Sequence, residues 1–585
     1  MKTMWDLSHL YNNDLEWEND FKELESKINS LNEITDFIST IEKFTNFLEL
    51  KIEAEILVEK LYCYAKRHLD VDSTLGNYKK MMQEALSLYN NILMINNRFE
   101  NEIISNDEKI KQYLKTEKLK KYERYIHLIL RRKNHIVSTN ELQEKGLDYP
   151  TKIQELKDSY QELFNTIIKF DNIEIDGEEV NVNRTNYNSL ILNEKQENRK
   201  HIFDVYTAAY EKANNELASI YLEKLKNDIE LALLENYDSL LGKKLFELEL
   251  PDKILTVLIN EVNKNLNIMH SYTELKKKIS GLEHYHIYDA TASVSEIPKI
   301  EIEFNEAVDI VKKSLGVLGT DYINLINRMF NEGWIDVYPK DNKRTMSFTC
   351  ISYTGVPYVL INYDKLISSV RTLGHEIGHS VNTYYSKINN EYIYFEFSYF
   401  LTEIASKVNE ILVNEYMLDN CKTIEEKKYI LNSIISNIGN SLFGQIMLTE
   451  FEHSIINKLS NNEKITANEL NELYFEISEK YNGSSLEYDD NIKYGWSKIP
   501  HFIMQDTYYV YQYSIGICIA SNIAYRILNK EDNIIEKYIK FLSAGNSVSV
   551  KEALKYVDID LNNSDYINDT IKTLSKKIDQ LKQLY

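Results

Sequence analysis

Two histidines four residues apart, with a glutamate beside the first, are the residues of this chain whose types and spacing best support chemistry. They are His375, Glu376 and His379, in the stretch RTLGHEIGHSVNTYY at 371–385. On a helix, residues four apart leave the same face, so both imidazoles can converge on one ion. Glu376 lies about 100° further round, near the water that such an ion would hold. The pattern predicts a zinc site, against the alternative of two histidines on a buried helix.

A catalytic zinc site typically uses three protein ligands and leaves one position for water, so a third ligand has to be found. Metzincins would continue HExxH with a glycine and a third histidine, but Asn382 and Tyr385 occupy those positions. The next helical stretch carries Glu403, 28 residues after His375, at the margin of an apolar stripe. A second, antiparallel helix could return this carboxylate to the histidines. Seven residues on, Glu410 is either a partner that orients a ligand histidine or a solvated helix charge.

The element that must position the histidines is a helix. After Asp364, which could cap it, apolar residues recur at three- and four-residue spacing, and this pattern predicts a buried helix. Gly374 and Gly378 weaken a helix, which indicates that another element approaches closely. On the helix of Glu403, the small residues Ala405 and Ser406 would keep the contact with the histidine helix tight.

A small sheet is predicted directly before the histidine helix. The stretch 334–363 alternates and is rich in aromatic residues, with turn signals between its parts. Within it, PYVLINY at 357–363 is either an exposed edge strand that could pair with a peptide backbone or a strand that serves only the core of the sheet.

The rest of the chain reads as mainly helical. Only 6 prolines and 17 glycines interrupt 585 residues, and long stretches place apolar residues at helical spacing. The helical period lapses around Asp176-Gly177, which marks a turn between two short extended pieces. We therefore predict an N-terminal helical lobe at 1–190 and a larger C-terminal domain at 191–585, which carries the predicted catalytic zinc site.

Composition excludes several classes of function. The net charge of -22 disfavours nucleic acid or an anionic membrane as partner, because the mean field repels phosphate. Four widely spaced cysteines without a CxxC pair predict neither a disulfide framework nor a thiolate zinc site. The chain shows no signal-peptide pattern and no run of about 18 apolar residues, so we expect a cytoplasmic enzyme. Its oligomeric state cannot be inferred.

Several segments resemble the M3 metallopeptidases, and within them the oligoendopeptidase F group. They are WDLSHLY near the start, GWIDVYPKDNKR at 333–344, PYVLINY at 357–363, VRTLGHEIGHS at 370–380, FLTEIASKVNE at 400–410, and IPHF and YYVYQYSIG between 499 and 516. The resemblance implies a mainly α, two-lobed helical ellipsoid with a deep central channel. It also implies one zinc ion per chain held by His375, His379 and Glu403, Glu376 as general base, and short unfolded peptides as substrates that are cut at internal bonds.

The same resemblance implies that the IPHF and YYVYQYSIG segments contact the substrate. His501 is the preferred donor to the oxyanion, and Tyr508 and Tyr511 are further catalytic candidates, although the family register does not separate them from Tyr509 and Tyr513. Two positions depart from the family pattern. Relatives usually have a glycine-rich strand where this chain has TMSFT at 345–349, and often an acidic residue where it has Ser369; substrate register or the surroundings of the ligands could differ there.

Two other functions fit the zinc helix. One is a zinc-bearing peptide-binding scaffold without turnover, which Glu376 argues against because binding alone needs no general base. The other is a carboxypeptidase or aminopeptidase with the same helix. Cleavage of peptides with blocked ends would distinguish an endopeptidase from both.

Overall fold

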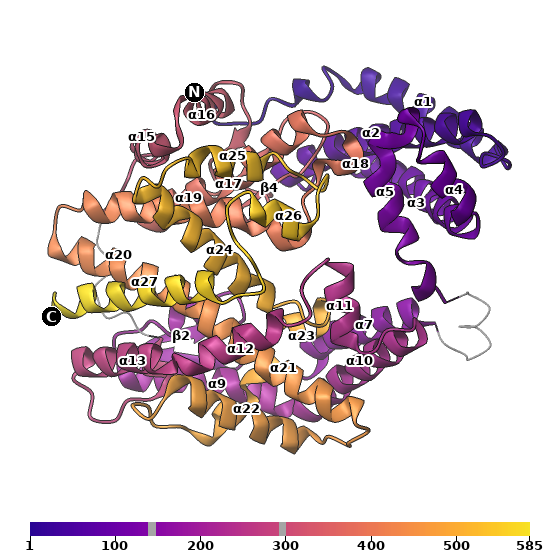
Figure 1. Ribbon diagram of the computed structural model, residues 1–585. Coiled ribbons are helices and arrows are strands. Elements are labelled where there is room, and N and C mark those ends of the chain that lie inside the picture. The colour runs from indigo at the N-terminus through magenta and orange to yellow at the C-terminus, as the bar shows by residue number, and fades with distance from the viewer. Residues whose placement is uncertain (138–147, 292–299) are drawn as a thin grey trace. The chain divides into compact units, whose positions relative to one another are not determined.

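The computed structural model describes residues 1–137, 148–291 and 300–585, and the protein is mainly helical (Figure 1), which confirms the predicted fold class. The chain separates into two compact units, each built from three segments of sequence. The predicted division into 1–190 and 191–585 coincides with none of the breaks between these segments, and it stays a prediction. The deep central channel implied by the family resemblance also stays a prediction. Unit 1 consists of Met1–Asn134, Ile300–Met417 and Ile523–Asp560, and unit 2 of His135–Lys299, Leu418–Asn522 and Leu561–Tyr585.

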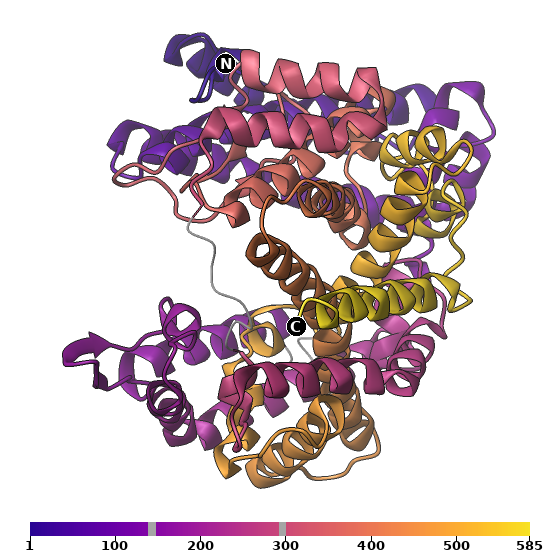
Figure 2. The same ribbon diagram turned by 90° about the vertical axis from the view of Figure 1, so that its left-hand side faces the viewer.

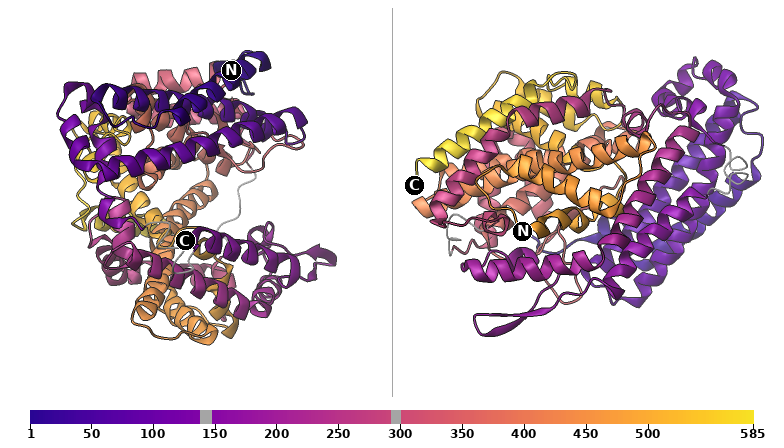
Figure 3. Two further views of the ribbon diagram at one scale, coloured as in Figure 1. Left: turned by 90° about the vertical axis from the view of Figure 1, so that its right-hand side faces the viewer. Right: turned by 90° about the horizontal axis from the view of Figure 1, so that it is seen from below.

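Unit 1 begins with long helices that lie side by side (Figure 3). A side-chain cap fixes where the first begins, because Asn13 accepts a hydrogen bond from the backbone amide of Glu16. Phenylalanines fill the core between the second and third, where the rings of Phe47 and Phe99 stack with centroids 5.9 Å apart. The helices of this part are α1 (Asp14–Glu33), α2 (Ile41–Val71), α3 (Gly76–Ser105), α4 (Asp107–Tyr113) and α5 (Glu123–Leu130).

The second segment of unit 1 contains the small sheet and the histidine helix. Its first two helices, α15 (Phe304–Leu315) and α16 (Thr320–Asn331), lie side by side (Figure 2). The remaining elements of the unit are β3 (Ile335–Asp336), β4 (Phe348–Thr349), β5 (Val359–Leu360), α17 (Ile367–Asn389), α18 (Tyr392–Phe395), α19 (Tyr399–Asp419), the end of α24 (Tyr511–Leu528), α25 (Ile534–Leu542) and α26 (Val550–Lys555).

The three short strands form one sheet in the order β3-β5-β4, with β5 parallel to β3 and antiparallel to β4. Both residues of β5, Val359 and Leu360, are fully buried. The interpretation of 357–363 as an exposed edge strand is therefore wrong, because β5 is the central strand and its hydrogen-bonding groups serve its neighbours. The edge of this sheet nearest the histidine helix is β4.

Helix α17 carries both histidines, and its apolar stripe is buried as predicted, including Val370, Leu373 and Ile377. Asp364 is not its cap, since the position before the helix is Leu366. Instead the Asp364 carboxylate accepts hydrogen bonds from the Leu366 amide and the Ser369 hydroxyl, and so it fixes the turn that leads into the helix.

Unit 2 is also helical, and its described residues include a β-hairpin. The hairpin pairs β1 (Asn172–Ile175) with β2 (Glu178–Asn181) in antiparallel register. Asp176 and Gly177 form its turn with φ of 55° and 90°, which confirms the predicted turn. The helices are α7 (Tyr149–Thr166), α8 (Tyr187–Leu190), α9 (Gln196–Lys212), α10 (Asn214–Leu234), α11 (Leu240–Glu247), α12 (Ile254–Lys264), α13 (Leu266–Ser280), α14 (Ile287–Ala290), α20 (Ile424–Gly439), α21 (Gln445–Ser460), α22 (Ala467–Asn482), α23 (His501–Met504), most of α24, and α27 (Asp565–Lys582).

Within the described ranges, no helix combines the length and the apolar character that crossing a membrane requires.

Helical segments of other types connect these elements. The 3-10 helices are Leu7–His9, Glu117–Tyr122, Lys133–His135, Gly316–Leu318 and Asp490–Lys498, and a π-helical turn lies at Asn440–Gly444.

Candidate active site

The structure brings His375 and His379 of α17 together with Glu403 of α19. The Nε2 atoms of both histidines lie 3.7 Å from Oε2 of Glu403, and the three ligand atoms all lie within 4.8 Å of one another. Ligands held about 2.1 Å from one tetrahedral zinc lie roughly 3.4 Å apart. The group therefore fits one zinc ion with little movement. Of the residues that the structure describes, no other three His, Cys, Asp or Glu side chains converge in this way.

Two glycines allow α17 and α19 to approach closely enough for this convergence. A Cβ on Gly378 would lie 2.6 Å from the Ser406 Cα and 2.7 Å from the Ala405 carbonyl oxygen. One turn earlier, a Cβ on Gly374 would lie 2.8 Å from a methyl group of Val413. The predicted close contact at the two glycines is confirmed: Ala405 and Ser406 make it at Gly378, and Val413 makes it at Gly374.

The imidazole of His379 is in the neutral form, which is the form that binds a metal ion. Burial lowers the pKa of His379 to about 4, an effect that the neighbouring His375 strengthens and Glu403 opposes. The imidazole of His379 is therefore neutral at pH 7, with a lone pair available for coordination.

Glu410 is a buried partner of His375 and not a solvated helix charge. Its Oε2 lies 3.3 Å from Nδ1 of His375 and accepts a hydrogen bond of 2.9 Å from Lys407 Nζ, while Arg371 Nε lies 3.6 Å from its other oxygen. Burial alone would raise the pKa of Glu410, but Lys407, His375 and Arg371 together hold it well below its ordinary value. A carboxylate here keeps the proton of His375 on Nδ1 and so directs the lone pair of Nε2 toward Glu403.

Glu376 lies on the same helix as the two histidines, and its carboxylate is buried. The hydroxyl of Thr349 on β4 lies 2.8 Å from its Oε2 and 2.9 Å from its backbone carbonyl oxygen, so the single hydroxyl proton is shared between these two acceptors. Burial raises the pKa of Glu376, partly offset by His375 and by this hydrogen bond. The departure from the family pattern at 345–349 thus reaches the candidate base. Sequence reasoning missed this contact, because periodicity does not relate a strand residue to a helix residue 27 positions later.

His501 lies in unit 2, at the start of α23. Burial lowers its pKa, so its ring is neutral at pH 7. The rings of Tyr509 and Tyr513 pack around it with centroids 5.8 Å and 6.1 Å away. Tyr508 and Tyr511, the candidates chosen from the sequence, are only 2% and 0% exposed. Packing therefore separates the four tyrosines in a way that the alternating sequence could not.

The network around Tyr508 explains its burial. Its φ is 61°, in the left-handed region, and its backbone amide donates to the buried carboxylate of Glu452 at 3.0 Å. Its hydroxyl lies 2.8 Å from Nδ1 of His453. These contacts hold the residue inward, against α21.

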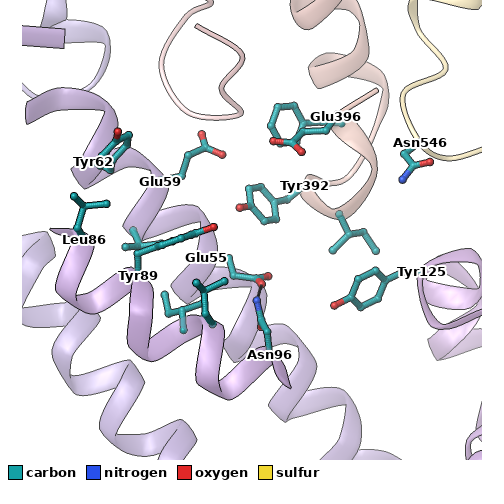
Figure 4. Close-up of a pocket in the computed structure, with 15 residues that line it drawn as sticks. Glu55, Glu59, Tyr62, Leu86, Tyr89, Asn96, Tyr125, Tyr392, Glu396 and Asn546 are labelled. Atoms are coloured by element: carbon teal, nitrogen blue, oxygen red, sulfur yellow. Dashed lines mark hydrogen bonds between the residues drawn. The ribbon is translucent and has the colours of Figure 1, made fainter. Parts of the chain in front are cut away.

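Unit 1 also contains a cavity of about 610 Å³ (Figure 4). Glu59 extends into it from α2, and Glu396 from the segment that follows α18. Two of its three carboxylates already have partners, since Glu55 pairs with Lys51 at 2.8 Å and Glu59 accepts the Tyr353 amide at 2.8 Å. Glu59 therefore anchors the loop that follows β4. The charged and aromatic residues of the lining are Glu55, Glu59, Glu396, Tyr62, Tyr89, Tyr125, Tyr392 and Phe395.

Comparisons with known proteins agree along almost the whole chain. Residues 189–573 match the model of peptidase family M3. The oligoendopeptidase F homolog of Borreliella burgdorferi is 31% identical over 587 residues, which cover 99% of this chain and 98% of that protein. Oligopeptidase PepF of Bacillus subtilis is 29% identical over 588 residues, 99% of this chain and 87% of its own. The crystal structure of oligoendopeptidase-F from Enterococcus faecium superposes with a TM-score of 0.73 at 27% identity, covering 98% of this chain and 99% of that one.

Proposed function

The chain belongs to peptidase family M3 and is a metalloendopeptidase, and from this premise we propose that it hydrolyses internal bonds of short, unfolded peptides with one zinc ion per chain. The observation that carries the proposal is the convergence of His375, His379 and Glu403 within 4.8 Å, on two helices packed at a glycine contact. The carboxylate of Glu376 on the same helix completes the set of groups that peptide hydrolysis needs.

We propose His375, His379 and Glu403 as the zinc ligands, with Glu410 holding His375 in its ligand orientation. The neutral ring of His379, the carboxylate of Glu403 and the carboxylate of Glu410 behind His375 together fit a divalent cation. When bound, zinc supplies a Lewis acid that polarises a water molecule and the carbonyl of the bond to be cut.

Glu376 acts as the general base. Its carboxylate takes a proton from the attacking water and later gives it to the amine that leaves, so no covalent intermediate with the enzyme is required. Burial raises the pKa of Glu376, which brings its proton affinity closer to that needed for both transfers near neutral pH.

His501 donates a hydrogen bond to the oxygen that becomes negative in the transition state. Its neutral ring has an N–H to offer at pH 7, and a fourth zinc ligand would close the position that water needs. The choice of Tyr508 and Tyr511 as further substrate contacts stays a prediction. Because their side chains are buried, we add Tyr509 and Tyr513, whose rings flank His501, as candidates for the same role.

Short peptides are the proposed substrates because the relatives are named oligoendopeptidases and oligopeptidases. The test is mass spectrometry of products from peptides of about ten residues with both ends blocked, next to unfolded casein. We expect internal cuts in the blocked peptides and slow or no cleavage of casein. Cleavage only of peptides with a free end would indicate an exopeptidase, and binding without any product would indicate a scaffold.

A further inference from the structure

The carboxylate of Glu376 is held from outside its own helix. The Thr349 hydroxyl on β4 donates to Oε2 at 2.8 Å, and it is the one hydrogen-bond donor to this carboxylate within the described ranges of the chain. The same hydroxyl lies 2.9 Å from the Glu376 backbone carbonyl. The contact therefore fixes one particular oxygen of the side chain relative to the helix and leaves Oε1 for another partner.

Such a contact matters because a glutamate side chain is flexible. Burying a glutamate in one rotamer costs conformational entropy, and a general base works only within hydrogen-bond reach of the proton that it takes. A displacement of about 1 Å can cost 10²-fold in rate. A donor that holds Oε2 reduces the number of orientations that the carboxylate samples, without using the oxygen that must accept the proton.

We propose that Thr349 is a positioning residue for catalysis: its hydroxyl fixes Oε2 of Glu376 so that Oε1 faces the attacking water. The inference rests on the proposed function of Glu376 as general base. It gives a role to the 345–349 segment, which otherwise stands out only as a departure from the family pattern.

The hydroxyl of Thr349 is itself held in place by the strand that carries it. Phe348 pairs with Leu360 of the central strand, and the Cys350 amide donates to the Tyr358 carbonyl at 2.7 Å. Threonine is also β-branched, which restricts its χ1 angle and so the direction of its hydroxyl. The strand thus presents the hydroxyl to Glu376 from a fixed position.

The loop after β4 is anchored to a helix of the N-terminal part of unit 1. Oε1 of Glu59 on α2 accepts hydrogen bonds from the backbone amides of Tyr353 and Thr354 at 2.8 Å and 3.0 Å, and from the Ser352 hydroxyl at 2.6 Å. Thr349 therefore lies between two fixed points of the chain, the strand pair that β4 forms with β5 and the loop that Glu59 holds, and both limit its movement. The position of the base is in this way supported by a residue from the first segment of the unit, Met1–Asn134.

The experiment compares Thr349→Val, which keeps the shape and removes the donor, with Thr349→Ser, which keeps the donor. In the zinc-loaded protein we expect Thr349→Val to lower kcat about 10- to 100-fold on a short blocked peptide, with KM changed less than about twofold. Zinc content and Tm should stay those of the unsubstituted protein. Thr349→Ser should recover most of the lost kcat.

A matched control removes a threonine hydroxyl from the zinc helix itself. Thr383 is buried on α17, and its hydroxyl donates to the backbone carbonyl of His379 at 2.9 Å and not to a proposed catalytic side chain among the described residues. Thr383→Val is expected to keep kcat within about twofold. A loss as large in this control as in Thr349→Val would overturn the inference, because any missing hydroxyl near the site would then have the same effect.

Three other results would overturn it: a wild-type kcat in Thr349→Val, an equal loss in Thr349→Ser, or a loss of zinc or of Tm that accounts for the lower rate. Glu376→Gln separates this inference from the proposed function. If that variant is inactive while Thr349→Val is fully active, only the positioning role fails; if it is active, the general base is wrong as well. Combining both substitutions should lower kcat no further than Glu376→Gln alone, because Thr349 acts through Glu376.

Discussion

Nδ1 of His375 lies 3.3 Å from Oε2 of Glu410, while Nε2 of the same ring lies 3.7 Å from Oε2 of Glu403. The two nitrogens of one imidazole thus face two different carboxylates: Nδ1 faces Glu410, which orients the ring, and Nε2 faces Glu403, the proposed zinc ligand. Glu410 is buried and has Lys407 beside it, so it stays ionised and accepts a hydrogen bond from the Nδ1–H group of the ring. That leaves the lone pair of Nε2 on the side where Glu403 and His379 converge.

Replacing Glu410 with Gln should weaken zinc binding about 10- to 100-fold, as is typical when the partner of a ligand histidine is lost. The amide is uncharged and can turn its NH₂ group toward Nδ1, which would favour the wrong tautomer of His375. Zinc affinity is measured by titration against a competing chelator. Glu415→Gln is the matched control, because Glu415 lies on the same helix and accepts a hydrogen bond from Tyr525 instead. Equal affinities in the two variants would show that Glu410 has no role in holding the ligand.

Exchanging a ligand and exchanging the base should have separable effects. His379→Ala is expected to lose zinc during mild dialysis, because two protein ligands remain of three. Glu376→Gln should keep its zinc while kcat falls by at least about 10². Metal analysis and peptide turnover are measured on the same samples. Full zinc content in His379→Ala would contradict the ligand set, and near-normal turnover in Glu376→Gln would contradict the hydrolytic mechanism.

The convergence of His375, His379 and Glu403 could be predicted from the sequence because helical spacing fixes the geometry of the two histidines. Residues four apart must share a face, which placed His375 and His379 together, and the glycines of the same helix indicated that another element would approach closely. Glu403 followed from the need for a third ligand on a following helix. The first two steps used only local periodicity, and the third used the number of protein ligands that a catalytic zinc ion needs.

What could not be predicted depends on contacts between elements. Strand pairing places β5 in the centre of its sheet and β4 at the edge, and no feature within PYVLINY decides that order. The Thr349 contact to Glu376 depends on the same order. Burial likewise distinguishes Tyr508 from Tyr509, since alternation alone gives four tyrosines equal standing. The composition of the two units from six segments also arises from long-range packing.

Gly378→Ala should damage both stability and zinc binding. The added Cβ would lie 2.6 Å from the Ser406 Cα and 2.7 Å from the Ala405 carbonyl oxygen, and both are backbone atoms that cannot turn away. Forcing a methyl group into a packed contact costs about 1–3 kcal/mol, and here it would push Glu403 away from the histidines. We expect a lower Tm and weaker zinc binding, measured by thermal unfolding and chelator competition.

Gly316→Ala is the control for this substitution. Gly316 has a φ of -57°, and a Cβ added to it would meet no atom of the described residues within 4 Å. Alanine is therefore expected to leave Tm unchanged or slightly raised. Equal Tm values for Gly378→Ala and Gly316→Ala would mean that the helix contact yields easily and does not constrain the site.

His501→Ala should keep its zinc and its fold but turn over slowly. Removing one donor to an oxyanion typically lowers kcat about 10²- to 10³-fold, whereas removing a ligand also strips the metal. Turnover of a short blocked peptide and zinc content are the two readouts. His270→Ala is a suitable control, because that histidine lies in the same unit, has its Nε2 atom 3.1 Å from the Lys480 carbonyl oxygen and is not proposed to meet the substrate or a substrate-contacting residue. Loss of zinc, or unchanged kcat/KM, in His501→Ala would contradict the assignment.

Glu452 should make unit 2 less stable as the pH rises from about 4.5 to 7. Burial raises its pKa from 4.5 to about 7, although Lys224 and the amide of Tyr508 oppose the shift. Below pH 4.5 the carboxyl is protonated whether the protein is folded or unfolded, so nothing is lost. Between 4.5 and 7 only the unfolded chain releases the proton, which favours unfolding by up to about 3 kcal/mol, and above 7 the loss is complete.

The Tm of Glu452→Gln should therefore exceed that of the unsubstituted protein by more above pH 7 than at pH 5. The measurement is thermal unfolding of both proteins over that pH range. The amide oxygen of the variant side chain can still accept the Tyr508 amide. Glu450→Gln, on the same helix, is the matched control, because the pKa of Glu450 is shifted in the opposite direction. Burial alone would raise this pKa, but hydrogen bonds from Lys480, Tyr481 and Asn263 outweigh burial and lower it below its ordinary value. That carboxylate stabilises the fold above pH 4.5 and loses its effect only as the pH falls, so its replacement should lower Tm by a constant amount between about pH 5.5 and 8. Parallel Tm curves for Glu452→Gln and the unsubstituted protein across this window would show that Glu452 is ionised in the native state throughout.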